Sequence, residues 1–138
     1  MNRLQLQTLS AAREHEASTL LEARLYSGSL YLMGYAVECA LKACIARMTQ
    51  RHEFPDKTRA RVSWTHDLEV LARTAGLWGD LTATMESDLD LSRNWTVVSG
   101  WSAESRYELQ VSDHRAHAFH SACTDDRAGV LSWIRGRW

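Results

Sequence analysis

Four side chains on one face of a predicted helix have the chemistry to hold an anionic ligand. Tyr31, Tyr35, Glu38 and Lys42 occur at i, i+4, i+7 and i+11, so a helix with about 3.6 residues per turn places them in one stripe. A lysine ammonium contacts a phosphate as a point charge, and a carboxylate one turn away can hold that ammonium in place. The alternative is an ordinary helix flank, in which Glu38 and Lys42 form an exposed ion pair and the tyrosines cover the core.

A second set of potential ligands recurs at every third residue near the end of the sequence, namely His114, His117, His120 and Cys123. These side chain types bind zinc. Steps of three residues drift by about 60° around a helix, so no more than two neighbours converge on one ion. We therefore predict no metal site and no cofactor, and we interpret the histidines as a solvated or subunit-facing stripe.

The composition is that of a folded domain without a general affinity for nucleic acid. The 138 residues are 45% hydrophobic and 24% charged, with a formal net charge of -1. This profile excludes a disordered chain, and the missing positive excess requires any phosphate contact to be local. Three cysteines without paired spacing, no secretion signal and no run of about 18 apolar residues indicate a cytoplasmic protein without a membrane span.

Helices must position these residues, because two-residue alternation is nearly absent and Pro55 is the only proline. We predict one domain, residues 1–138, built as an all-α up-and-down bundle of four to five helices. The predicted helices span about 11–23 after a Ser10 cap, 28–48 after Ser27, 66–76 after Thr65, 79–98 before Gly100, and 113–136 after Ser112. The polar stretch 51–64 is predicted to be the longest loop, and most of the six tryptophans to be core residues.

Five stretches resemble, in this order, the HEPN family of small prokaryotic helical domains. They are "GSLYLMGYAVECALKACIA", "FP", "THDLEVLARTAGL", "NWTVVSGWSAESRY" and "AFHSACTDDRAGVLSWI", and the resemblance covers about residues 11–135. It implies a bundle of four to five helices that dimerises through its helices. It also implies a gene beside a nucleotidyltransferase in a toxin-antitoxin or antiphage system, and for many members a metal-independent ribonuclease activity.

The catalytic signature of the family is an arginine followed by a histidine after four to six residues, with two copies meeting at a dimer cleft. An arginine there can hold the scissile phosphate, while a histidine exchanges protons with the ribose hydroxyl or the leaving oxygen. By resemblance, Arg106 in "ESRY" is the candidate arginine, but the next histidine, His114, follows at a longer spacing. Arg115 with His120 has the family's spacing. His66, which opens the third predicted helix, is not a candidate.

Two further interpretations of the "ESRY" segment remain open. Arg106 either contacts a ligand phosphate or forms a structural ion pair with Glu104 or Glu38, and Tyr107 either stacks on a base or packs in the core. We expect Tyr35, Glu38, Lys42, Arg106 and Tyr107 to line one nucleotide-binding cleft, with Arg106 and His114 as the candidate catalytic pair.

Three functions are compatible with these residues. The first is a HEPN-like homodimeric module that binds a nucleotide or RNA and acts with a partner, such as a nucleotidyltransferase or an antitoxin. The second is a ribonuclease toxin that uses Arg106 and His114, and the third is a structural dimerisation module. We favour the first, because the spacing from Arg106 to His114 departs from the family's signature.

Overall fold

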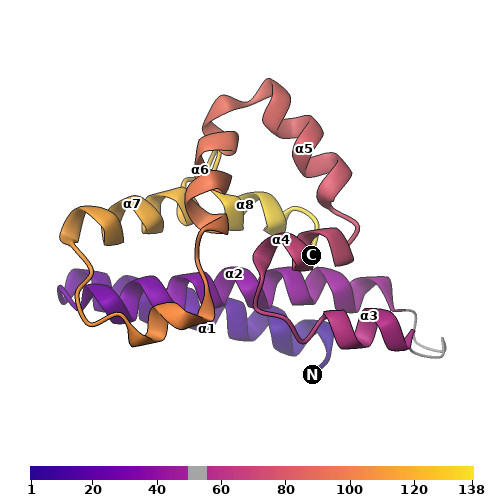
Figure 1. Cartoon of the computed structure of the whole chain (residues 1–138), viewed down its shortest axis with the longest axis horizontal. Helices are drawn as coiled ribbons and strands as arrows, with labels where there is room; N and C mark the ends of the chain where they lie inside the picture. The colour runs from indigo at the N-terminus through magenta and orange to yellow at the C-terminus, as the bar shows by residue number, and fades with distance from the viewer. Residues whose placement is uncertain (50–55) are drawn as a thin grey trace.

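The computed structural model describes residues 1–49 and 56–138, and all regular secondary structure among these residues is helical (Figure 1). The elements in chain order are α1 (Arg3–Glu22), α2 (Tyr26–Met48), α3 (Lys57–Val62), α4 (Leu68–Thr74), α5 (Trp78–Ser87), α6 (Leu89–Ser99), the 3₁₀ helix η1 (Ala103–Tyr107), α7 (Asp113–Thr124) and α8 (Val130–Arg135). The predicted all-α class is confirmed.

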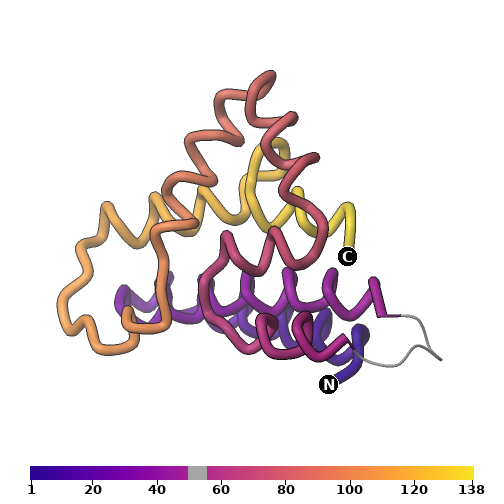
Figure 2. The backbone as a smooth tube through the Cα atoms, turned by 45° about the vertical axis from the view of Figure 1, so that its right-hand side comes forward, coloured from indigo at the N-terminus to yellow at the C-terminus, as the bar shows by residue number. Residues whose placement is uncertain are grey.

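The helices α1 and α2 form an antiparallel hairpin (Figures 1 and 2). α1 begins earlier than predicted, because Asn2 and Gln5 form a reciprocal capping box. The predicted cap Ser10 is instead buried inside the helix, where its hydroxyl donates to the carbonyl of Ala36 in α2 at 2.7 Å. Ser29 donates in the opposite sense, from α2 to the carbonyl of Ala17 in α1 at 2.8 Å. Two buried hydroxyls therefore join the backbones of the hairpin.

α2 is the central helix, and α1, α4, α7, α8 and η1 all pack against it. Its predicted apolar stripe is confirmed from Leu30 to Cys44, whereas Met48 at the end is 39% exposed. α2 is long and apolar enough to cross a membrane by length and composition alone. However, 72% of its most apolar 18-residue window is buried by the other helices, as expected for the core helix of a helical bundle.

Two predicted long helices are each broken by an aspartate that caps backbone N–H groups. Asp88 separates α5 from α6, with its carboxylate accepting from the N–H groups of Asp90 and Leu91. Asp125 separates α7 from α8 in the same way, through the N–H groups of Arg127 and Ala128. The predictions of single helices over 79–98 and 113–136 were wrong, because these side chains offer the backbone a partner outside the helix. The predicted Ser112 cap of α7 is confirmed.

The segment before α4 is also more structured than predicted. Residues 51–55 of the predicted loop lie outside the described residues, as does the "FP" stretch, but α3 occupies much of the remainder. Asp67 caps α4 by accepting from the N–H of Val70 at 3.0 Å, and Thr65, the predicted cap, accepts from the N–H of Asp67 at 3.1 Å. α4 is followed by Gly76 in the predicted left-handed conformation, with φ of 71°.

A glycine in α2 fixes the position of the segment between α6 and α7. The indole of Trp101 lies against Gly34 so closely that a Cβ there would be 2.2 Å from the indole Nε1 and Cε2 atoms. Trp101 is 6% exposed and belongs to the core. Because η1 begins two residues later, this contact places η1 beside the N-terminal half of α2 (Figure 1).

Candidate functional site

The carboxylate of Glu38 lies at the centre of the candidate site and is buried. Its side chain is 1% exposed, its Oε1 is 2.7 Å from the Nζ of Lys42, and both of its oxygens are 3.0 Å from the Nδ1 of His66. A buried carboxylate is costly unless it is paired and hydrogen-bonded, and here three contacts satisfy it. The helix-flank alternative is wrong in taking the pair to be exposed, because Glu38 faces the protein interior, whereas the ion pair itself and the packing of Tyr31 and Tyr35 against the core agree with that alternative.

His66 joins this site from a different part of the chain, the turn before α4. An ionised carboxylate only accepts hydrogen bonds, so with Glu38 ionised the contact requires the tautomer of His66 that has an N–H at Nδ1, and this N–H is the hydrogen-bond donor. The side chain of His66 remains 56% exposed. Sequence reasoning missed this residue, since a spacing of 28 positions carries no signal that two side chains meet.

Aromatic rings continue the stripe from Glu38 toward the start of α2. The Tyr35 ring is parallel to the Tyr31 ring at a centroid distance of 6.4 Å, and Tyr31 stacks against Trp101 at 6.2 Å. Burial is the main cause that raises the pKa of the Tyr35 hydroxyl, and the charge of Glu38 adds to it. Tyr35 therefore remains neutral, and both tyrosines are packing groups between the two charged ends of the stripe.

Arg106 lies at the other end of the stripe, on η1. Its guanidinium is 4.9 Å from the centroid of the Tyr107 ring, and polar contacts with Tyr107 first, and also with Glu104 and Tyr31, raise the pKa of Arg106. The ion-pair partners of Glu38 are Lys42 and His66, so Glu38 does not pair with Arg106. Tyr107 is 68% exposed, which rules out the interpretation of Tyr107 as a core residue.

Lys42 and Arg106 lie at opposite ends of one helix face. Arg106 contacts Tyr31, and Lys42 follows Tyr31 by 11 residues on the same face, which corresponds to about 16 Å along the helix axis. Figures 1 and 2 show α3 and η1 along the same side of α2, and Lys42 borders one groove together with Arg59 and Ala60 of α3. The two cations are thus on the same side of the molecule, but too far apart for both to contact one phosphate oxygen.

His114 lines a different groove from Lys42. This groove has a volume of about 420 Å³ and is bordered by Trp101, Ser105, Glu108, His114 and Arg115. Arg115 forms an ion pair with Glu108, and that contact is the main cause that lowers the pKa of Glu108. Arg106 is not among the residues that border the groove, so the described residues do not bring Arg106 and His114 together in one recess.

The histidines of α7 have separate environments. The Nδ1 of His117 is 2.5 Å from Oδ1 of Asp113, and the Nε2 of His120 is 2.9 Å from the hydroxyl of Ser18 in α1. The thiol of Cys123 is completely buried in the core. Arg115 and His120, which have the spacing of the family's signature, are therefore engaged with different partners, Glu108 and Ser18.

No protein-family model matches the chain, and neither a curated protein nor a solved structure shows significant similarity to it.

Proposed function

We propose that this protein is a HEPN-like helical module that binds the phosphate of a nucleotide or an RNA at Lys42 and acts together with a partner protein. One observation carries this proposal: the ammonium of Lys42 is held at 2.7 Å by a carboxylate that is 1% exposed. Moving a charge of this kind out of water costs several kcal/mol per ion. An apolar pair at these positions would pack α2 without that cost, so a function of the charges is the better explanation.

The geometry around Lys42 suits an anion. An ammonium has three N–H donors, and Glu38 accepts one of them. The side chain of Lys42 is 22% exposed, which leaves donors for a ligand at the surface. Because Glu38 fixes the ammonium in advance, less side-chain entropy is lost on binding than for a free surface lysine.

Arg106 supplies a second phosphate contact in this proposal. It is exposed, and the neighbouring exposed ring of Tyr107 offers a stacking surface for a base. Since Tyr31, the residue of α2 nearest to Arg106 in this stripe, and Lys42 are about 16 Å apart along the helix axis, each cation would contact a different phosphate. An extended RNA strand would reach both, whereas a mononucleotide would use one.

The partner in this proposal is a second copy of the chain together with a nucleotidyltransferase or an antitoxin in the cytoplasm, as the resemblance to the HEPN family implies. The end of the stripe at η1 supports a protein contact. Leu109, two residues beyond η1, is 94% exposed, and Tyr107 is 68% exposed. A partner that covers Leu109 would remove this apolar side chain from water, as the buried centre of a protein interface does.

The test measures RNA binding and RNA cleavage in parallel, in EDTA. We expect the wild-type protein to retain a short single-stranded RNA without cutting it, with an affinity that falls as salt rises. Arg106→Ala and Lys42→Met should each weaken binding about 5- to 10-fold, whereas Lys57→Met, the only other lysine substitution possible in this chain, should not. Cleavage that is lost in Arg106→Ala and His114→Ala would favour the ribonuclease. Self-association without RNA binding would favour the structural dimer.

A further inference from the structure

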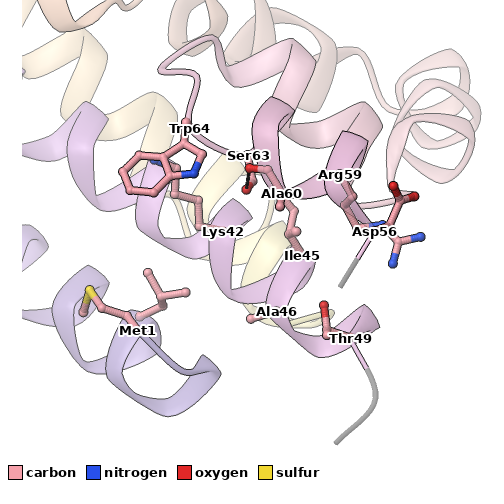
Figure 3. A pocket seen from close by; sticks show the side chains of 11 residues that line it. Met1, Lys42, Ile45, Ala46, Thr49, Asp56, Arg59, Ala60, Ser63 and Trp64 are labelled. Atoms are coloured by element: carbon pink, nitrogen blue, oxygen red, sulfur yellow. Dashed lines mark hydrogen bonds between the residues drawn. The ribbon is translucent and has the colours of Figure 1, made fainter. Parts of the chain in front are cut away.

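A groove of about 520 Å³ lies beside Lys42, between α2, α3 and the start of α1 (Figure 3). Its volume is within the range of about 300 to 1,000 Å³ that is typical of small-molecule sites. Part of its lining is apolar and comes from Ile45 and Ala46 of α2 and from Leu6 of α1. Lys42, from the stripe on α2, is part of the wall.

An exposed tryptophan forms one side of this groove. Trp64 is 82% exposed, and in Figure 3 its indole lies next to Lys42 and Ser63, with Met1 across the opening. An indole is a large apolar surface, and one left in water is unusual unless it meets a partner. Here the flat face is available for stacking with another ring.

One cation in the wall of the groove, Lys42, can bind an anionic ligand. Lys42 and Arg59 contribute two positive charges to the wall, and Asp56 contributes one negative charge. The carboxylate of Asp56 accepts a hydrogen bond from the N–H of Thr58 at 2.9 Å as the cap of α3. Glu38 behind Lys42 adds a second negative charge, so the nearby charges balance; the feature that suits an anion is the fixed ammonium of Lys42, which has N–H donors beyond the one that Glu38 accepts.

We propose that this groove is a binding site for a nucleoside phosphate, with the heterocycle stacked on Trp64 and the phosphate on Lys42. The proposal rests on the proposed function, because it uses the same Lys42, and it adds a subsite for the base. The combination of an anion donor, an apolar lining and an exposed indole distinguishes a nucleotide from the alternatives. A bare phosphate would leave the apolar lining and Trp64 unused, and an apolar molecule would leave the cations unused.

The experiment compares four probes by titration calorimetry: AMP, ribose 5-phosphate, adenosine and a 5'-phosphorylated hexa-adenylate. AMP should bind to the wild-type protein at least 10-fold more tightly than ribose 5-phosphate or adenosine. Trp64→Ala should weaken AMP about 5- to 100-fold, which is the range for one lost stacking contact, and Trp64→Phe should retain most of the affinity. Binding of ribose 5-phosphate should not change in Trp64→Ala.

Variants at Lys42 test the phosphate half of the site. Lys42→Met should remove binding of ribose 5-phosphate, and Lys57→Met is the matched control that should leave it unchanged. Because Lys42→Met leaves Glu38 with one fewer partner, the double variant Glu38→Gln with Lys42→Met provides a folded alternative without a buried unpaired carboxylate. Thermal unfolding followed by circular dichroism confirms that each variant is folded.

The outcomes separate the two proposals. If AMP and ribose 5-phosphate bind equally and Trp64→Ala changes neither, the base subsite is wrong while phosphate binding at Lys42 stands. If no phosphate-bearing probe binds, both proposals are wrong, and equal binding of adenosine and AMP overturns the role of Lys42. The hexa-adenylate shows whether the ligand is an RNA or a free nucleotide. If it binds more tightly than AMP and this advantage is lost in Arg106→Ala, the ligand is an RNA. If it binds as tightly as AMP, the ligand is a free nucleotide.

Discussion

The indole of Trp101 occupies the space that a side chain at position 34 would need. A Cβ on Gly34 would lie 2.2 Å from the indole nitrogen, well inside van der Waals contact. A glycine inside a helix lowers its stability relative to alanine. At position 34 the glycine is needed because it allows the segment that carries η1 to approach α2 closely.

Gly34→Ala should destabilise the protein by about 1 to 3 kcal/mol, because the added methyl group displaces Trp101 from the core. Gly79→Ala is the matched control. Gly79 is in the first turn of α5, and nothing lies within 4 Å of a Cβ there, so alanine should stabilise the protein by up to about 1 kcal/mol, the helix-interior difference in propensity. Urea unfolding of both variants measures the two effects. If Gly34→Ala raised the free energy of unfolding as much as Gly79→Ala does, Trp101 would have to move away from position 34 at no cost, and the predicted clash would be wrong.

The Glu38–Lys42 pair should be worth more than an exposed pair of the same spacing. Removing one partner of a fully buried pair costs about 3 to 5 kcal/mol, because the other charge is left unpaired in the interior. Glu38→Ala should cost less than that but more than the loss of an exposed pair, because the side chains it leaves unpaired, Lys42 and His66, are 22% and 56% exposed. Glu69 and Arg73 are also four residues apart, at 2.8 Å, but are 47% and 52% exposed, and Glu69→Ala should cost less than about 0.5 kcal/mol. Double-mutant cycles on the two pairs provide the comparison. A coupling energy for Glu38–Lys42 as small as that for Glu69–Arg73 would contradict the buried geometry.

The stability should fall in mild acid because of His120. Burial is the main cause that lowers the pKa of His120 below its ordinary value, against the opposing charge of Glu14, and its ring nitrogens contact the hydroxyls of Ser18 and Thr124. The unfolded chain therefore takes up a proton on His120 at a higher pH than the folded chain does. The contribution of His120 to the free energy of unfolding is fully present above the ordinary histidine pKa of about 6.5. It is lost as the pH falls from there toward the lower pKa that His120 has in the folded protein.

Urea unfolding from about pH 5 to pH 8 measures this dependence. The decrease in the free energy of unfolding on acidification should be smaller in His120→Gln, which cannot take up that proton. Glutamine can still accept or donate a hydrogen bond at Ser18. An identical pH dependence in the wild-type protein and the variant would exclude His120 as a source of the acid sensitivity.

The cysteines should be unreactive in the folded protein. Burial raises the pKa of Cys39 and of Cys44 to about 11, and it raises the pKa of Cys123 further, so few thiolates exist near neutral pH. A thiol reagent at pH 8 should label the native protein slowly and all three residues rapidly in denaturant. Fast stoichiometric labelling of the native protein would indicate that α2 or α7 opens readily.

The sequence predicts the long elements better than their ends. α2 follows from its apolar stripe, and Ser112, Gly76 and Gly100 mark helix ends where predicted. The breaks at Asp88 and Asp125 were not predicted, since an aspartate in a helical pattern is compatible with both an exposed helix surface and a cap. Ser10 was assigned as a cap for the converse reason: a buried serine that bonds to a neighbouring helix has the same local sequence as a cap.

The candidate site was only partly predictable. The stripe on α2 depends on helical spacing alone, so the relation of Tyr31 and Tyr35 to Glu38 and Lys42 was accessible from the sequence. The burial of Glu38 and its contact with His66 depend on how α4 packs, which no local pattern encodes. The expectation that most tryptophans are core residues holds, since the other five belong to the core or pack against it. Trp64 is the exception at 82% exposed, and its sequence does not reveal this because burial depends on neighbours that are distant in sequence.

Because Trp101 packs on Gly34, a substitution at this interior position should also affect residues at the surface. Arg106 follows Trp101 by five residues and lies in η1 together with the buried Ala103 and Ser105. The orientation of Arg106 therefore depends on how Trp101, Ala103 and Ser105 pack. Gly34 and Trp101, which do not contact the proposed ligand, would in this way determine the position of Arg106, which does. A genetic screen for loss of function should accordingly recover changes at Gly34 alongside changes at Arg106 itself.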